Sequence, residues 1–162
     1  MQKRIVSVLF MVIGVLVGTI IGGGIVGKKI SEVTEKMRKL SDKHFALFMM
    51  MNRWVKIKQD GKCLESYFIQ NGYKNIAVYG MSYVGETLLN ELYNSEVKIM
   101  YGIDKNTYEI CSDINIVLPE DVTDEVDAII VTAISFFDEI KENLRDSISC
   151  PILSLEDILY EI

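Results

Sequence analysis

The sequence predicts a small α/β protein with a mostly parallel, doubly wound sheet of five strands, preceded by two helical segments. From residue 61 onward, short apolar runs typical of buried strands alternate with amphipathic runs typical of helices. This alternation is typical of a parallel sheet with helices on both faces. Before residue 61 the chain has one uncharged apolar run and one run with helical periodicity. We therefore divide the chain into a transmembrane anchor (1–29), a juxtamembrane helix (30–60) and an α/β domain (61–162).

The predicted anchor is a segment of 23 uncharged residues, 5–27, with a basic pair on each side. As a helix it would be roughly 34 Å long, and the hydrocarbon core of a bilayer is about 30 Å thick. A signal peptide has a shorter apolar region of about 7–15 residues, so we expect an uncleaved, single-pass helix in the cell membrane. Basic residues are more numerous after the segment than before it, and this bias predicts that the C-terminal domain is cytoplasmic.

Three glycines recur every four residues within this segment, at Gly14, Gly18 and Gly22. On a helix they would share one face, where small residues let a second membrane helix approach closely. This pattern predicts a homo-oligomer, or a partner helix, packed on that face. The alternative is that glycine is simply frequent in membrane helices.

The juxtamembrane helix is predicted over residues 30–59. Its stripe has alternating spacings of three and four, as in a coiled-coil seam, and comprises Ile30, Val33, Met37, Leu40, His44, Leu47, Met51 and Trp54. Further apolar residues widen this face after His44, and a face that wide more often packs on its own domain. We therefore expect an exposed stalk over 30–40 and a helix over 41–59 that packs on the domain or on a second copy. His44 is expected to be buried or interfacial.

The α/β domain is predicted to contain strands at 76–79, 97–103, 114–118, 128–133 and 151–153. Helices are predicted from Cys63 to a stop at Asn71-Gly72, from the turn at 80–85 to about Tyr93, over 136–144, and over 155–160. Ser154, with Asp157 three residues later, is expected to cap the last helix. The acidic residues 120–127 are expected to form a solvated turn.

The distribution of charge excludes some partners. Residues 1–59 hold 11 Lys and Arg against 3 Asp and Glu, whereas residues 60–162 hold 6 against 20. The basic part suits an anionic lipid surface, and the acidic part makes nucleic acid an unlikely partner. The cysteines form no C-x-x-C pattern and the chain has one histidine, so the sequence predicts neither a metal site nor a catalytic residue set.

A candidate ligand site follows the first strand, at the loop Gly80-Met-Ser82-Tyr-Val-Gly85. The loop has the spacing of a dinucleotide-binding loop, with Ser82 in place of the middle glycine. Asp104 follows the second strand, where an acidic residue can bind a ribose hydroxyl, and Thr132 ends the fourth strand beside the same crevice. Two alternatives remain: Glu86 would stabilise the helix dipole without any ligand, and Asp104 would cap a turn with Asn106.

A family resemblance extends this prediction. Residues from about 41 to 162 resemble the Rossmann-like domains of bacterial cell-surface polysaccharide biosynthesis proteins, which are similar to the nucleotide-binding half of nucleotide-sugar epimerases and dehydratases. The matching stretches are residues 54–58, 72–80, 102–105, 127–132 and 154–158. The resemblance implies a Rossmann-like fold, NAD or a nucleotide sugar as ligand, and a polysaccharide-biosynthesis enzyme as partner. Tyr101 and Lys105 have the spacing of a dehydrogenase pair, but they fall on a strand, where side chains alternate between faces.

These observations predict a membrane-anchored, cytoplasmic module that binds a nucleotide or nucleotide sugar without turning it over. One alternative is a ligand-free scaffold that docks a membrane glycosyltransferase. The other is an epimerase or oxidoreductase that a partner chain completes.

Overall fold

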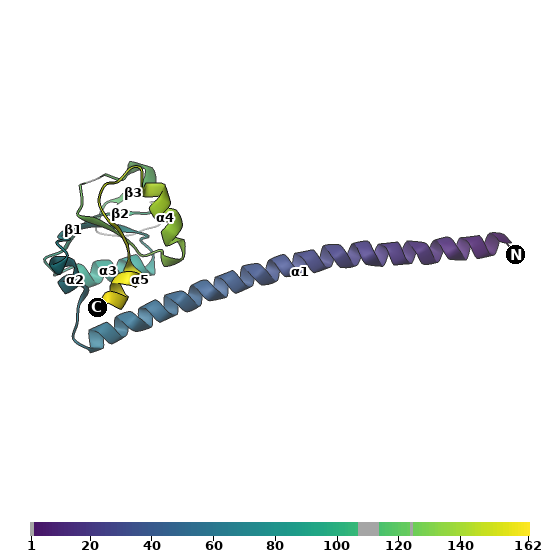
Figure 1. Cartoon of the computed structure of the whole chain (residues 1–162), viewed down its shortest axis with the longest axis horizontal. Coiled ribbons are helices and arrows are strands. Elements are labelled where there is room, and N and C mark those ends of the chain that lie inside the picture. Colours follow the sequence, from purple (N-terminus) through teal and green to yellow (C-terminus); the bar gives the residue numbers. More distant parts are fainter. Residues whose placement is uncertain (1, 107–113, 124) are drawn as a thin grey trace. The chain divides into compact units, whose positions relative to one another are not determined.

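The computed structural model describes residues 2–106, 114–123 and 125–162, with side chains from residue 28 onward. The chain divides into two units, Met1–Phe45 and Ala46–Ile162. A single helix, α1 (Gln2–Gln59), runs through both of them (Figure 1). The predicted juxtamembrane helix is therefore continuous with the helix that precedes it.

The predicted membrane span and its three glycines lie outside the residues whose side chains are described, although their backbone is helical. In the part of the chain whose side chains are placed, no helix combines the length and the apolar character needed to cross a membrane. The rest of the first unit, residues 28–45, is exposed helix surface, and His44 is exposed on it. The expectation that His44 is buried is wrong for the single chain, because no other element of the first unit covers this helix.

Five parallel strands form one sheet in the described part of the second unit, in the order β3-β2-β1-β4-β5. The strands are β1 (Asn75–Tyr79), β2 (Lys98–Ile103), β3 (Ile116–Val117), β4 (Ala128–Val131) and β5 (Ile152–Ser154). All four strand pairs are parallel. The predicted α/β class is confirmed, and this strand order is that of a doubly wound, Rossmann-like sheet.

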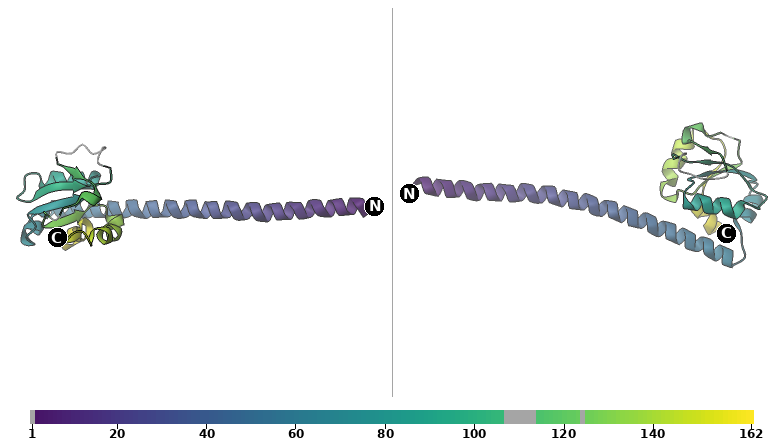
Figure 2. Two further views of the ribbon diagram at one scale, coloured as in Figure 1. Left: turned by 90° about the horizontal axis from the view of Figure 1, so that it is seen from above. Right: turned by 180° about the vertical axis from the view of Figure 1, so that it is seen from behind.

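Helices cover both faces of this sheet (Figures 1 and 2). The helices are α2 (Leu64–Gln70), α3 (Tyr83–Leu92), α4 (Phe137–Leu144) and α5 (Leu155–Glu161), and the short turns are η1 (Pro119–Asp121) and η2 (Ile134–Phe136). Side chains of β1 alternate between two cores: Ile76 and Val78 pack with α2, α3 and α5, whereas Ala77 and Tyr79 pack on the side of α4. This alternation follows from the two-residue period of a strand.

The last turns of α1 belong to the first of these cores. Met50, Trp54 and Ile57 are buried there, and Leu47 packs partly buried beside them. Complete burial of one such apolar side chain contributes roughly 1.5–3 kcal/mol relative to exposure. The second unit, Ala46–Ile162, therefore includes the C-terminal end of α1, and its core contains residues that precede the predicted start at residue 61.

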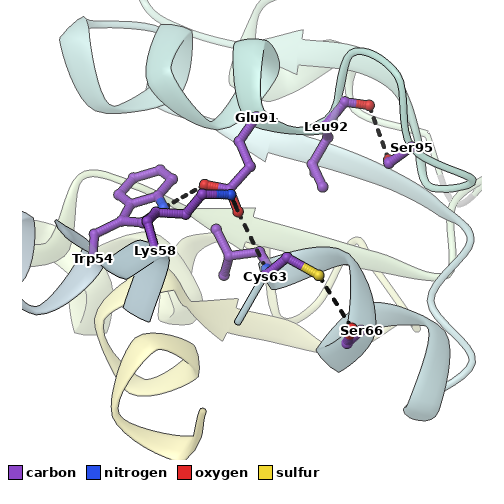
Figure 3. A network of polar contacts seen from close by, with 8 residues as sticks. Trp54, Lys58, Cys63, Ser66, Glu91, Leu92 and Ser95 are labelled. Atoms are coloured by element: carbon purple, nitrogen blue, oxygen red, sulfur yellow. Dashed lines mark hydrogen bonds and ion pairs between the residues drawn. The ribbon is translucent and has the colours of Figure 1, made fainter. Parts of the chain in front are cut away.

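Glu91, on α3, connects three segments around this core (Figure 3). The indole N–H of Trp54 donates to Oε2 of Glu91 at 2.5 Å, and Lys58 Nζ lies 3.1 Å from Oε1. The backbone N–H of Leu64, at the start of α2, donates to Oε1 at 3.2 Å. The Glu91 side chain is only 10 % exposed. One carboxylate thus connects the end of α1 to α3 and to the start of α2.

Two local predictions differ from the structure. Ser154 occupies the N-cap position of α5 but makes no side-chain cap hydrogen bond. It is also the last residue of β5 and is buried, so its side chain follows the strand instead of turning toward the first turn of the helix. The acidic segment 120–127 is not a purely solvated turn, because Asp127 Oδ2 accepts hydrogen bonds from the backbone N–H groups of Lys74 and Asn75.

We predict that Glu91→Ala lowers the free energy of unfolding of the second unit by about 1–3 kcal/mol, because the indole N–H of Trp54 loses its buried acceptor. Denaturant unfolding followed by Trp54 fluorescence measures this loss. Asn90→Ala, an exposed change at the adjacent helix position, is the control and is expected to leave stability nearly unchanged. Equal stability of the two variants would contradict the proposed role of Glu91.

Candidate functional site

The carboxyl ends of β1, β2 and β4 meet at one edge of the sheet. Tyr79, the last residue of β1, is in register with Ile103 of β2 and with Val131 of β4. The residues that follow these three, Gly80, Asp104 and Thr132, therefore lie side by side. In an open parallel sheet, ligands bind beyond this edge, where the direction of the strand order reverses, which here is between β1 and β4.

The turn from β1 into α3 depends on two glycines. Gly80 has φ +97°, a left-handed backbone conformation that residues other than glycine rarely adopt. A Cβ atom on Gly85 would collide with the carbonyl oxygen of Gly80. Gly80 therefore makes the tight turn, and Gly85 permits close packing between strand and helix.

Asp104 holds this turn against the end of β2. Its Oδ2 accepts a hydrogen bond from the backbone N–H of Met81 at 2.9 Å, and its Oδ1 accepts one from Asn106 N–H at 3.0 Å. The turn with Asn106 is the alternative that the sequence left open. Asp104 is half-buried, and the N–H group of Met81 within the loop is already bonded to it. Because a carboxylate can accept about four hydrogen bonds, Asp104 retains capacity for a ligand.

Thr132 supports the same turn from the side of β4. Its hydroxyl is within hydrogen-bonding distance of the carbonyl oxygens of Tyr79 (3.1 Å) and Gly80 (2.5 Å), and the residue is 4 % exposed. The structure therefore places Thr132 beneath the turn, where its hydroxyl bonds to the backbone. It positions the loop and does not face the crevice.

The first turn of α3 is the part of this edge that is best placed to contact a ligand. The first hydrogen bond of α3 runs from Glu86 N–H to the Ser82 carbonyl oxygen at 3.0 Å. The N–H groups of Tyr83, Val84 and Gly85 come before it, where a helix offers no acceptor of its own. Ser82 is the exposed N-cap residue, and its side chain makes no cap hydrogen bond. The positive end of the helix dipole lies at the same point, so this turn favours an anion.

Carboxylates near this edge of the sheet disfavour an anionic ligand. The pKa of the Tyr79 phenol is raised, first by burial and then by the negative charges of Asp104, Glu139 and Glu120. An anionic ligand would therefore meet favourable N–H groups at the start of α3 and unfavourable charges around it.

The two residues with the spacing of a dehydrogenase pair, Tyr101 and Lys105, lie in β2 and just after it. Tyr101 lies in β2, and its hydroxyl donates to the carbonyl of Thr123 at 2.6 Å, while Lys105 is exposed beyond the strand. The side chains therefore do not form the helical tyrosine–lysine pair of a dehydrogenase. Across residues 28–106, 114–123 and 125–162, no three His, Cys, Asp or Glu side chains are grouped so as to hold a metal ion.

Sequence reasoning missed two residues that shape the site. Met81, in the middle of the loop, is buried in the core and anchors the loop from below. Asp127 binds the backbone at the start of β1, at the opposite end of the strand that delivers the loop. The burial of Met81 could have been predicted from the sequence, because an apolar residue stands there inside a glycine-containing turn. Nothing local in the sequence indicated the partners of Asp127.

The structure thus contains a Rossmann-like α/β module whose candidate ligand site lies at the carboxyl edge of its sheet. Residues 72–151 are similar to a protein family described as C2185-like, N-terminal. This segment begins just before β1 and ends just before β5, and it contains the whole crevice. No curated protein and no solved structure matches the chain.

We predict that Asp104→Ala destabilises the second unit by about 1–3 kcal/mol, because the Met81 N–H loses its half-buried acceptor. The loss follows from the half-buried position of Asp104, because replacing an exposed carboxylate would leave stability nearly unchanged. Asp104→Asn, which keeps one acceptor oxygen, should lose less. Denaturant unfolding of the three chains measures the order, and an Asp104→Ala chain as stable as the parent would show that these hydrogen bonds do not matter.

Proposed function

We propose that this protein is a non-catalytic module that binds a nucleotide or nucleotide sugar at the crevice between β1 and β4. The observation that carries the proposal is the free first turn of α3, whose N–H groups and exposed Ser82 hydroxyl stand beside a glycine turn of the dinucleotide-binding kind. A phosphate would bind at this helix start. Asp104 would use its remaining acceptor capacity to bind the hydroxyls of a ribose diol. Its negative charge would repel a 2′-phosphate, so NAD-like or UDP-like ligands are favoured over NADP.

The resemblance to polysaccharide-biosynthesis domains supports a role in surface polysaccharide synthesis, with an enzyme of that process as partner. The hydrogen-bonded position of Tyr101 argues against an epimerase or oxidoreductase that a partner chain completes. A second candidate function, a scaffold without ligand that docks a membrane glycosyltransferase, has a specific observation in its favour. Asp104 and Thr132 are both bonded to the backbone, so the crevice is stable without a ligand.

We predict that NAD or a UDP-, GDP- or dTDP-sugar raises the Tm of the second unit, and that NADP raises it less. A ligand at 100 times its Kd stabilises the folded state by about 2.7 kcal/mol, which shifts the Tm of a domain of this size by several degrees. The full chain can be used, because its single tryptophan, Trp54, is buried in the second unit and reports its unfolding.

Ser82→Asp separates binding from folding in this experiment. Aspartate and serine are about equally good N-cap residues, so the unliganded Tm should stay the same or rise. The added charge should abolish the ligand-induced shift, whereas the uncharged, equally good cap in Ser82→Asn should retain it. No shift with any ligand would support the scaffold. A shift that persists in Ser82→Asp would place the site elsewhere.

We further propose that residues 5–27 anchor the module in the cell membrane as a single-pass helix with the C-terminal domain in the cytoplasm. The length and charge-free character of the segment support the span, and the basic residues that follow it support the orientation and contact with anionic lipid. In the same proposal, Gly14, Gly18 and Gly22 form the face through which two such helices pack.

We predict that the chain fractionates with membranes and resists alkaline extraction, and that protease added to intact cells leaves residues 30–162 uncut. The same protease should digest the domain once the cells are opened, which is the control for its susceptibility. Cleavage in intact cells would reverse the proposed orientation, and release by alkaline extraction would refute the span.

A further inference from the structure

Four apolar side chains form a stripe on the exposed part of α1 that precedes the second unit. Ile30, Val33, Met37 and Leu40 follow one another at spacings of three, four and three residues, so they share one helix face. They are 61, 57, 60 and 45 % exposed. We call these four residues the stalk seam. In a heptad, Ile30 and Met37 occupy a positions, and Val33 and Leu40 occupy d positions.

The opposite face of the same turns carries ion pairs. Lys39 Nζ lies 2.8 Å from Glu35 Oε1, and Arg38 Nε lies 4.0 Å from Asp42 Oδ2. In the same heptad these residues occupy b, c and f positions, which point away from a partner helix. The stalk therefore combines an apolar seam with a solvated outer face, as in a helix that pairs through its seam.

The residues beside the seam favour a parallel pair. The g positions hold Lys29, Lys36 and Lys43, and the e positions hold Thr34 and Ser41. In a parallel two-stranded coiled coil, each g position faces an e position of the other helix, so lysines meet hydroxyl side chains. In an antiparallel pair, g positions face each other and the lysines would repel. A second copy in parallel orientation therefore fits the charges.

The available face ends near His44. Leu47, the next d position, already packs partly buried against the core of its own unit, and Met50 and Trp54 beyond it are buried there. His44 itself is exposed and would take the a position in the last turn of a pair. Before His44 the stripe is thus exposed and can contact a partner, whereas after His44 it packs on the core of its own unit.

We infer that the stalk seam packs against the stalk seam of a second copy, as a parallel two-stranded coiled coil over residues 30–44. Two heptads are short for helices that pair only through this seam, since isolated helices of about 12–15 residues are marginal. Pairing is therefore strengthened by anything that holds two chains together. The membrane anchor proposed above would do so and would also align both chains in the same direction.

Cysteine cross-linking of the full chain in membrane fractions tests this pairing. A disulfide forms only when the two Cα atoms are within about 7 Å. Facing d positions of a parallel pair meet this condition, so Val33→Cys and Leu40→Cys should each give a disulfide-linked dimer after mild oxidation. Each dimer band should clearly exceed that of the parent chain, whose own Cys63, Cys111 and Cys150 set the background.

Asp42→Cys is the matched control, because position f points outward and its exposed ion pair contributes little to stability. It should give no more dimer than the parent. Equal cross-linking at Leu40→Cys and Asp42→Cys would overturn the inference. Disulfides formed only between Val33→Cys and Met37→Cys chains in a mixture would show an antiparallel pair instead, because a positions face d positions in that arrangement. If the chain stays in the membrane but does not cross-link, the pairing is refuted and the membrane anchor is still supported. Ligand binding is measured separately, through Trp54 fluorescence.

Discussion

The need to cover both faces of an all-parallel sheet is the constraint on which the rest of this structure depends. Such a sheet exposes no face to water in stable proteins. One face here receives only short helices, of 7, 10 and 7 residues, and these leave space for another element. The last turns of α1 occupy it with Met50, Trp54 and Ile57, and Glu91 bonds to the same turns. The helix that leaves the N-terminal segment is therefore also part of the core.

This arrangement has a mechanical consequence. A helix that only tethered the domain would transmit little to it, because a flexible linker absorbs motion. Here α1 runs without a break from Gln2 to Gln59, and its final turns pack beneath α3. The same helix α3 begins at the candidate crevice and carries Glu91 near its end. The end of α1 that packs in the second unit is thus connected through α3 to the start of the candidate site.

The candidate crevice itself is held in place by its own polar groups. Asp104 fixes the loop from the side of β2, and Thr132 fixes it from the side of β4. The two residues that the sequence offered as ligand contacts thus act first on the protein backbone. A loop held in this way is preorganised, so a ligand would pay little to order it. The contacts that remain available, at Ser82 and the first N–H groups of α3, come from a region whose conformation is already set.

The class of the fold could be predicted from the sequence alone, because apolar periodicity reports burial directly and the alternation of strands and helices leaves few topologies. The same holds for the glycine turn, since Gly80 and Gly85 are required by local geometry alone. The roles of the polar residues, in contrast, depend on contacts made across the fold. The hydroxyl of Thr132 and the carboxylates of Asp104, Glu91 and Asp127 find their partners on segments far away in the chain, and no local pattern encodes such pairs. For the same reason the sequence left open whether residues 41–59 pack on the domain or on a second copy, and the burial of Met50, Trp54 and Ile57 shows that the last turns of α1 pack on the domain.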